Sequence, residues 1–179
     1  MKIEQEHIFN ELLVMKTQDG DMEAFSFLVK RWHPALLRQA YRLTRDDEAA
    51  LDVAQEAWRA IAKGIYRLKS PAAFGTWSFR IVSNKAANWV KDEQKIRSLK
   101  NDREAVIQED QKETSDNIEL IRKALNELPV KSRAILSMFY IDNHSVREIS
   151  EILSLSTGTV KSRLFYARKM LKEKFETFK

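Results

Sequence analysis

Helical periodicity runs almost without interruption along this 179-residue chain, and few residues in it would break a helix. Only four glycines and three prolines occur, and these two residue types oppose helix formation most strongly. Apolar residues recur at spacings of three and four, as they do on a helix with one buried face. No stretch sustains the alternation that is typical of a strand. We therefore predict an all-α protein.

Polarity divides the chain into three parts. The segment 92–117 has no aromatic residue and few apolar ones, so it cannot build a core of its own. We predict that it is a flexible polar linker with a helical start. It would join two small helical domains, 1–91 and 118–179.

Turn and capping residues predict four helices in the N-terminal domain. Asp21 is suited to cap the first, and Pro34 is expected to open the second. A third begins near Asp46. The pair Ser70-Pro71 then predicts the cap and first residue of a fourth helix.

The region from Ser145 to Leu171 has the pattern of a helix, a tight turn and a second helix. Ser145 and Glu148 have the spacing of a capping box. A serine-rich turn follows, after which Ser156 or Thr157 can cap the second helix. The pattern predicts a helix–turn–helix.

The second helix of this unit has two different faces. One face is apolar and carries Val160, Leu164, Ala167 and Leu171. Another is basic and aromatic and carries Lys161, Phe165, Arg168 and Lys172. Two core helices of an unrelated bundle would explain the first face but not an outward Phe165 between cations. A helix with both faces suits insertion into a DNA major groove.

The predicted fourth helix also lies in a stretch without acidic residues, 59–91. One of its stripes combines an aromatic ring, cations and amides: Trp77, Arg80, Asn84, Asn88 and Lys91. Rings stack on bases, cations pair with phosphates and amides bond to base edges, so this face fits single-stranded nucleic acid. For Phe74 and Trp77, burial in the core is an equally good interpretation.

The predicted third helix carries a row of charges that begins with acids. Asp52, Glu56 and Arg59 lie on one face, with Gln55 beside them. Spacing alone favours a solvated, salt-bridged face. The alternative is that the acidic start docks a basic protein partner.

Composition narrows the function further. The net charge of +5 favours a polyanionic partner. The absence of cysteine excludes disulfides, thiolate catalysis and Cys-ligated metal sites. The three histidines lack ligand spacing and no catalytic constellation stands out, so we predict no metal, no cofactor and no enzyme. The apolar runs are too short for membrane insertion, and Met1 to Glu11 does not have the pattern of a signal peptide.

Four motifs follow one another in a familiar order. They are Asp52-Val-Ala-Gln-Glu-Ala-Trp58, Phe74-Gly-Thr-Trp77-Ser-Phe-Arg80-Ile-Val-Ser-Asn84, Leu128-Pro129 and Gly158-Thr-Val-Lys-Ser-Arg163. With them the chain resembles bacterial RNA polymerase sigma factors of the extracytoplasmic-function (ECF) group, in the sigma-70 family. The resemblance covers about residues 19–91 and 118–174.

The resemblance implies a cytoplasmic transcription initiation factor with two helical domains, regions 2 and 4. In region 2, Asp52, Gln55 and Glu56 match the motif that grips the clamp helices of the polymerase largest subunit, which replaces the solvated-face interpretation. The residues implied to read and melt the downstream (−10) element are Lys69, Arg80, Asn84, Asn88 and Lys91. The loop 68–73 matches one that captures a flipped base. Phe74 and Trp77 are implied to be mainly structural.

Region 4 would read the upstream (−35) element and meet the polymerase flap. The implied DNA-binding residues are Thr159, Lys161, Ser162, Arg163, Phe165, Tyr166 and Arg168. The resemblance further implies an anti-sigma factor as partner and a role in a stress or envelope-signal response.

Three positions depart from the family pattern. Gly75 stands where a larger, often basic residue is common, Ser154 replaces the usual turn glycine, and Tyr166 replaces a frequent basic residue. A stand-alone helix–turn–helix regulator would explain 118–174 but leaves the stripes of 46–91 without a role. A helical adaptor that binds no DNA would explain neither basic face.

Overall fold

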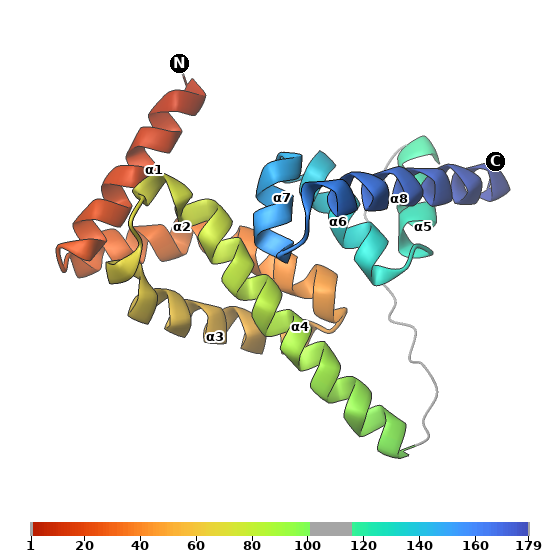
Figure 1. Cartoon of the computed structure of the whole chain (residues 1–179), viewed down its shortest axis with the longest axis horizontal. Coiled ribbons are helices and arrows are strands. Elements are labelled where there is room, and N and C mark those ends of the chain that lie inside the picture. The colour runs from red at the N-terminus through yellow and green to blue at the C-terminus, as the bar shows by residue number, and fades with distance from the viewer. Residues whose placement is uncertain (1, 101–115, 179) are drawn as a thin grey trace. The chain divides into compact units, whose positions relative to one another are not determined.

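The computed structural model describes residues 2–100 and 116–178, and within these ranges all regular elements are helices (Figure 1). This confirms the all-α prediction. Contacts divide the chain into two compact units, Met1–Leu99 and Lys100–Lys179. The predicted linker falls largely on 101–115, outside the described residues, and the domain boundaries remain predictions.

The first unit begins with helix α1, Lys2–Gln18, followed by α2, Met22–Thr44. Between them Gly20 has φ +95°, a conformation that glycine adopts without strain. The Asp21 carboxylate accepts hydrogen bonds from the backbone N–H groups of Glu23 and Ala24, at 2.9 and 3.0 Å. The predicted cap is therefore confirmed.

Pro34 does not open a helix, so that prediction was wrong. It lies inside α2, which is continuous from Met22 to Thr44. A proline within a helix removes one backbone hydrogen bond. Here the helix continues because Leu28 and Leu36, on either side of the proline, are both fully buried in the same core.

Helix α3, Asp47–Gly64, packs against α2. It begins next to Asp46, as predicted, and the Asp46 carboxylate caps it by accepting from the Ala49 N–H at 2.8 Å. Two short 3₁₀ turns follow, η1 at Ile65–Arg67 and η2 at Pro71–Ala73, and then α4, Phe74–Lys100. The pair Ser70-Pro71 opens η2 rather than α4, and the Ser70 side chain makes no capping bond.

An aromatic cluster joins α2 to α4 inside the first unit. The Trp32 ring meets the rings of Phe74 and Phe79 edge to face, with centroids 5.5 and 6.5 Å apart. Such pairs add stability beyond the burial of their area. Nearby, Gln39 Nε2 donates a hydrogen bond to Ser83 Oγ at 3.2 Å, and both residues are buried.

The second unit contains α5, Asp116–Asn126; α6, Val130–Tyr140; α7, Val146–Leu153; and α8, Thr157–Phe178. Helix α8 packs against the other three. Its stripe is buried at Val160, Leu164 and Ala167, as the spacing predicts. In α7 the buried residues are Ile149 and Ile152.

Candidate nucleic-acid and protein interfaces

The three acidic and amide residues predicted on the third helix lie together on the exposed face of α3. Asp52, Gln55 and Glu56 are all exposed. The Gln55 Oε1 atom accepts a hydrogen bond from Arg59 Nη2 at 3.1 Å. No side-chain hydrogen bond or ion pair engages the Asp52 carboxylate within the described part of the chain, so it is available to a partner.

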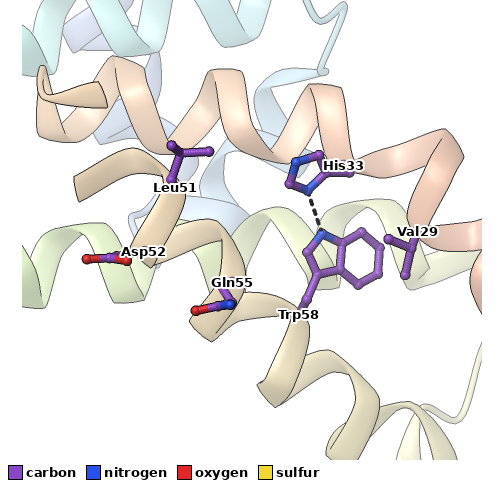
Figure 2. A pocket seen from close by; sticks show the side chains of 6 residues that line it. All are labelled: Val29, His33, Leu51, Asp52, Gln55 and Trp58. Atoms are coloured by element: carbon purple, nitrogen blue, oxygen red, sulfur yellow. Dashed lines mark hydrogen bonds between the residues drawn. The ribbon is translucent and has the colours of Figure 1, made fainter. Parts of the chain in front are cut away.

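An open hollow of about 410 Å³ lies beside this surface, between α2 and α3 (Figure 2). Its lining mixes apolar, aromatic and polar side chains: Val29, His33, Leu51, Asp52, Gln55 and Trp58. Leu51 is 55% exposed despite its size. Sequence reasoning missed Val29, His33 and Leu51. Only Leu51 gave a signal, as an apolar residue next to the acidic row.

One side of the hollow is held by a hydrogen bond. The Trp58 indole N–H donates to His33 Nδ1, with 3.2 Å between the nitrogen atoms (Figure 2). An imidazole nitrogen that accepts a hydrogen bond carries no proton, so this bond requires neutral His33 with its proton on Nε2. The Phe25 ring meets Trp58 edge to face. The indole is thereby fixed between α2 and α3.

Glu56 is tied to α4 by an ion pair that local sequence patterns do not predict. Lys85 Nζ lies 2.7 Å from Glu56 Oε2. The hydrogen bond from Lys85, followed by the attraction of its charge, lowers the pKa of the Glu56 carboxyl below its ordinary value. Because the partners are 29 positions apart, no helical spacing could have identified Lys85.

Helix α4 presents four of the five side chains of its predicted stripe to solvent. The exposed residues are Arg80, Asn84, Asn88 and Lys91. None of them has a side-chain hydrogen bond or ion pair within the described ranges. Phe79, Val82 and Ala86 are buried. The cations and amides thus form a continuous polar face on a helix anchored by its apolar face.

The fifth member of the stripe, Trp77, belongs to the packing of the unit. Its side chain is half-buried and lies 6.1 Å from the Phe74 ring. A Cβ atom at Gly64 would come within 2.9 Å of the Trp77 ring. The core interpretation therefore holds for fully buried Phe74, and packing also accounts for Trp77.

The structure explains the departure at Gly75 and shows the consequence of the departure at Ser154. At Gly75 a Cβ atom would lie 2.9 Å from the Trp32 ring, so a side chain there would collide with the aromatic cluster. Ser154 ends α7 with φ +53°, in the left-handed region. A serine there is strained where a glycine would not be.

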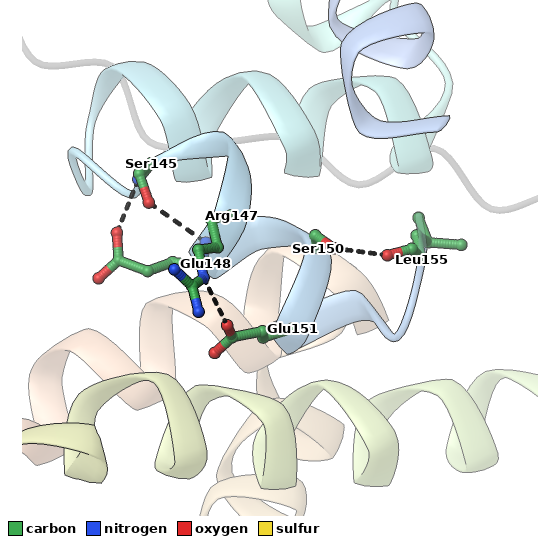
Figure 3. A network of polar contacts seen from close by, with 6 residues as sticks. All are labelled: Ser145, Arg147, Glu148, Ser150, Glu151 and Leu155. Atoms are coloured by element: carbon green, nitrogen blue, oxygen red, sulfur yellow. Dashed lines mark hydrogen bonds and ion pairs between the residues drawn. The ribbon is translucent and has the colours of Figure 1, made fainter. Parts of the chain in front are cut away.

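The first helix of the predicted helix–turn–helix has the expected capping box (Figure 3). The Ser145 N–H donates to Glu148 Oε2 at 2.8 Å, and the Glu148 N–H donates to Ser145 Oγ at 3.2 Å. At the other end, Ser150 Oγ donates to the Leu155 carbonyl at 2.6 Å. These bonds fix where α7 begins and how the chain turns toward α8.

Ser156 caps α8, which decides between the two predicted caps. Its Oγ atom accepts from the Thr159 N–H at 3.1 Å and lies 2.8 Å from Thr159 Oγ1. Beyond this cap the side chains that face solvent are Lys161, Ser162, Arg163, Phe165 and Tyr166. Phe165 and Tyr166 are each 62% exposed, and their rings meet edge to face with centroids 5.5 Å apart.

Arg168 differs from its neighbours on this face. Its guanidinium lies 5.7 and 5.8 Å from the ring centroids of Phe139 and Tyr140 on α6. Cation–π contacts of this kind hold a side chain in place. Further along, Lys172 pairs with Glu176 at 3.7 Å. The free part of the basic stripe is therefore its N-terminal half, around Lys161 and Phe165.

Comparison with protein families assigns both units. Residues 28–96 match the family described as Sigma-70 region 2, and residues 118–171 match Sigma-70, region 4. Together these segments cover more than half of the chain.

Several characterised proteins are similar over nearly the full length. The ECF RNA polymerase sigma-E factor of Escherichia coli (strain K12) is 27% identical over 186 residues, covering 96% of each chain. The RNA polymerase sigma-H factor of Pseudomonas aeruginosa is 24% identical over 182 residues, covering 90% of this chain and 91% of the relative.

Solved structures share the fold. The sigma factor RpoE of Bartonella quintana, solved with the anti-sigma factor NepR, has a TM-score of 0.72 at 21% identity, covering 85% of this chain and 96% of RpoE. CnrH, solved with the cytosolic domain of CnrY, has a TM-score of 0.66 at 25% identity, covering 94% and 98%.

Within the ranges 2–100 and 116–178, no helix has an apolar stretch that could span a bilayer. No group of three His, Cys, Asp or Glu side chains in them could hold a metal ion. The two family matches, in the expected order, and the ECF sigma factors that are similar over nearly the full length show that this chain belongs to the ECF group of the sigma-70 family. These proteins are transcription initiation factors rather than enzymes, and they direct RNA polymerase to promoters.

Proposed function

We propose that each unit of this sigma factor binds promoter DNA through one helical face, α4 in the first unit and α8 in the second. One observation carries the proposal. Each unit exposes an acid-free face with cations and amides or aromatic rings that have no polar partner within the described chain. A solvated face of this kind is compatible with a soluble protein, and its unpaired cations are available to a polyanion.

The α4 face is proposed to read and melt the downstream element. Amides recognise base edges once stacking is broken, and cations hold the phosphates. Arg80 and Asn84 lie one turn apart, so one can hold the backbone while the other reads a base. The full proposed set is Lys69, Arg80, Asn84, Asn88 and Lys91, with the loop 68–73 receiving an unpaired base.

The α8 face is proposed to enter the major groove of the upstream element. Free Lys161 and the exposed Phe165–Tyr166 pair lie in the first turns, where a recognition helix contacts base edges. Arg168 is held against α6 but can still direct an N–H group to a phosphate. The full proposed set is Thr159, Lys161, Ser162, Arg163, Phe165, Tyr166 and Arg168.

The α3 surface is proposed to bind core RNA polymerase at the clamp helices of its largest subunit, while the second unit meets the flap. Asp52, Gln55 and Glu56 offer acceptors to a basic partner, and exposed Leu51 offers an apolar contact beside them. An apolar centre with a charged rim is the usual anatomy of a protein interface.

An anti-sigma factor is proposed as a further partner, in a stress or envelope-signal response. CnrH, a quarter identical to this chain, was solved in complex with the cytosolic domain of CnrY. That complex, together with the ECF group to which the chain belongs, supports the proposal.

The polymerase contact is tested by reversing its charge. Asp52→Lys combined with Glu56→Lys should weaken binding to core polymerase on the order of 100-fold or more, because like charges across an interface cost several kcal/mol. Affinity is measured by fluorescence anisotropy of the labelled full chain. Circular dichroism checks that the helices remain.

A matched control makes the same change of charge elsewhere. Glu173→Lys with Glu176→Lys alters two exposed acids of α8 that do not belong to the α3 surface. This control should bind core polymerase as the wild type does. Wild-type affinity of the α3 double variant would refute the proposed contact.

A further inference from the structure

The side chain of Gln18, the last residue of α1, reaches a segment far along the chain. Its Nε2 atom lies 2.8 Å from the carbonyl oxygen of Ile65 and 2.8 Å from that of Leu68. Carbonyl oxygens only accept, and an amide nitrogen offers two N–H donors. Both donors of Gln18 are therefore used, and both are used on the same short segment.

The two carbonyls bracket the 3₁₀ turn η1. The Leu68 N–H closes this turn by donating to the Ile65 carbonyl at 3.1 Å. The two hydrogen bonds from Gln18 therefore hold η1, the last turn before the loop, against the end of α1. Helix α1 also contacts both η1 and η2. Hydrogen bonds from a helix end to two carbonyls leave the start of the loop little freedom.

The two residues that follow Leu68 face solvent. Lys69 and Ser70 are exposed. The Ser70 hydroxyl makes no capping bond, although it occupies the cap position of η2. The loop therefore combines an anchored root with a free ammonium group and a free hydroxyl at its tip, where both can reach a nucleotide.

We propose that Gln18 is a positioning residue for the capture of an unpaired promoter base. It holds the loop 68–73 in the conformation that receives an unpaired base, before the DNA arrives. The proposal rests on the proposed function, in which this loop captures that base. Its physical basis is preorganisation: a loop that is already ordered pays no ordering cost on binding. Gln18 acts through the loop and touches no DNA itself.

Three substitutions separate this role from a general contribution to stability. Gln18→Met keeps the length of the side chain and removes both donors. Gln18→Lys keeps donors at a similar reach and places a cation at the C-terminus of α1, which a helix favours. The control is Gln5→Met, the same change from glutamine to methionine at an exposed position of α1.

The readout is base selectivity at the captured position. The full chain, assembled with core polymerase, is bound to templates that are already unpaired across the downstream element and carry each of the four bases in turn. The captured base is identified by two properties of its template position. The wild type discriminates most strongly among the four bases there, and Lys69→Ala or Ser70→Ala reduces that discrimination. Core affinity and the temperature of unfolding are measured in parallel.

Gln18→Met should reduce this selectivity roughly tenfold, the equivalent of about 1.4 kcal/mol, at unchanged core affinity. Gln18→Lys should restore most of it, and Gln5→Met should match the wild type. Wild-type selectivity of Gln18→Met would overturn the proposal, as would a loss that Gln18→Lys does not restore. If the loop variants themselves leave selectivity unchanged, base capture by this loop is refuted and the role of Gln18 falls with it.

Discussion

At the scale of single residues, two glycines of the first unit make room for aromatic rings. A Cβ atom would lie 2.9 Å from Trp32 at Gly75 and 2.9 Å from Trp77 at Gly64. At Gly158 the nearest atom, Ser156 Oγ, would be 3.8 Å away, an ordinary contact. Glycine is thus required by packing at the first two positions and is not required by packing at the third.

Gly75→Ala is predicted to destabilise the protein by about 1 kcal/mol. Helix propensity favours alanine by up to about 1 kcal/mol, but overpacking costs about 1–3 kcal/mol. Overpacking prevails because the Trp32 ring is held by Phe74 and Phe79 and cannot give way. Urea unfolding measures the change. Gly158→Ala, the control, should be neutral or stabilising, and a Gly75→Ala protein as stable as the wild type would show that Trp32 is not so confined.

Residue-level features could be predicted from the sequence where both partners are close along the chain. The cap at Asp21, the helix start near Asp46 and the capping box at Ser145 are confirmed, because each of the bonds that fix them spans two or three residues. The reason for Gly75 could not be predicted, since Trp32 reaches it only through the tertiary fold. The same holds for His33 and Trp58, 25 positions apart.

At the scale of elements, an ion pair between α3 and α4 gives the first unit a pH-dependent contact. Lys85 lowers the pKa of Glu56. The stabilisation from this pair is therefore present above the unfolded-state pKa of the carboxyl and is lost as pH falls through the lower, folded-state pKa. The pair should hold throughout the neutral range and open only in acid.

Lys85→Met should raise the pKa of Glu56 toward its ordinary value. NMR titration of the Glu56 side-chain carboxyl carbon follows this directly. Lys63→Met is the control. It removes a cation of α3, the helix that carries Glu56, and Lys63 is not among the causes of the pKa shift, so the Glu56 titration midpoint should stay in place. An unchanged Glu56 midpoint in Lys85→Met would mean that the pair does not persist in solution.

Helix α8 makes a second prediction at this scale. If Lys161 contacts only phosphate, Lys161→Ala should weaken binding to all DNA sequences alike and reduce the salt slope by about one. If it reads a base, the loss should be about 1–3 kcal/mol and confined to one position. Duplex binding by the full chain across a salt series distinguishes the two. Unchanged affinity at every salt concentration would remove Lys161 from the interface.

The existence of most helices could be predicted from periodicity, but two elements could not. Helix α1 has no clear polar face: Leu13 and Val14 are buried, while Ile8, Leu12 and Met15 are exposed on the other side. Its apolar residues therefore lack a one-sided stripe. In α2 tertiary burial on both sides of Pro34 outweighs the local signal of the proline.

At the scale of the whole molecule, each of the two described units has its own packed hydrophobic core and one exposed basic face. The family follows from both units together, since regions 2 and 4 match in order along one chain. The roles of Asn84 and Lys161 are predicted by spacing and by the family motifs, whereas the role of Asp52 is implied by the family motif alone, because spacing there favours a solvated face. The structure adds Lys85, which only the fold brings to Glu56, and Gln18, which only the fold brings to the root of the loop 68–73.

The central claim is that this chain directs core RNA polymerase to a defined set of promoters. Sequencing the 5′ ends of RNA made in vitro from genomic DNA, by core polymerase with and without the full chain, tests it most directly. We predict new start sites that appear only with the chain and share two upstream sequence blocks, one for each DNA-binding face. Start sites identical to those of core polymerase alone would contradict the account.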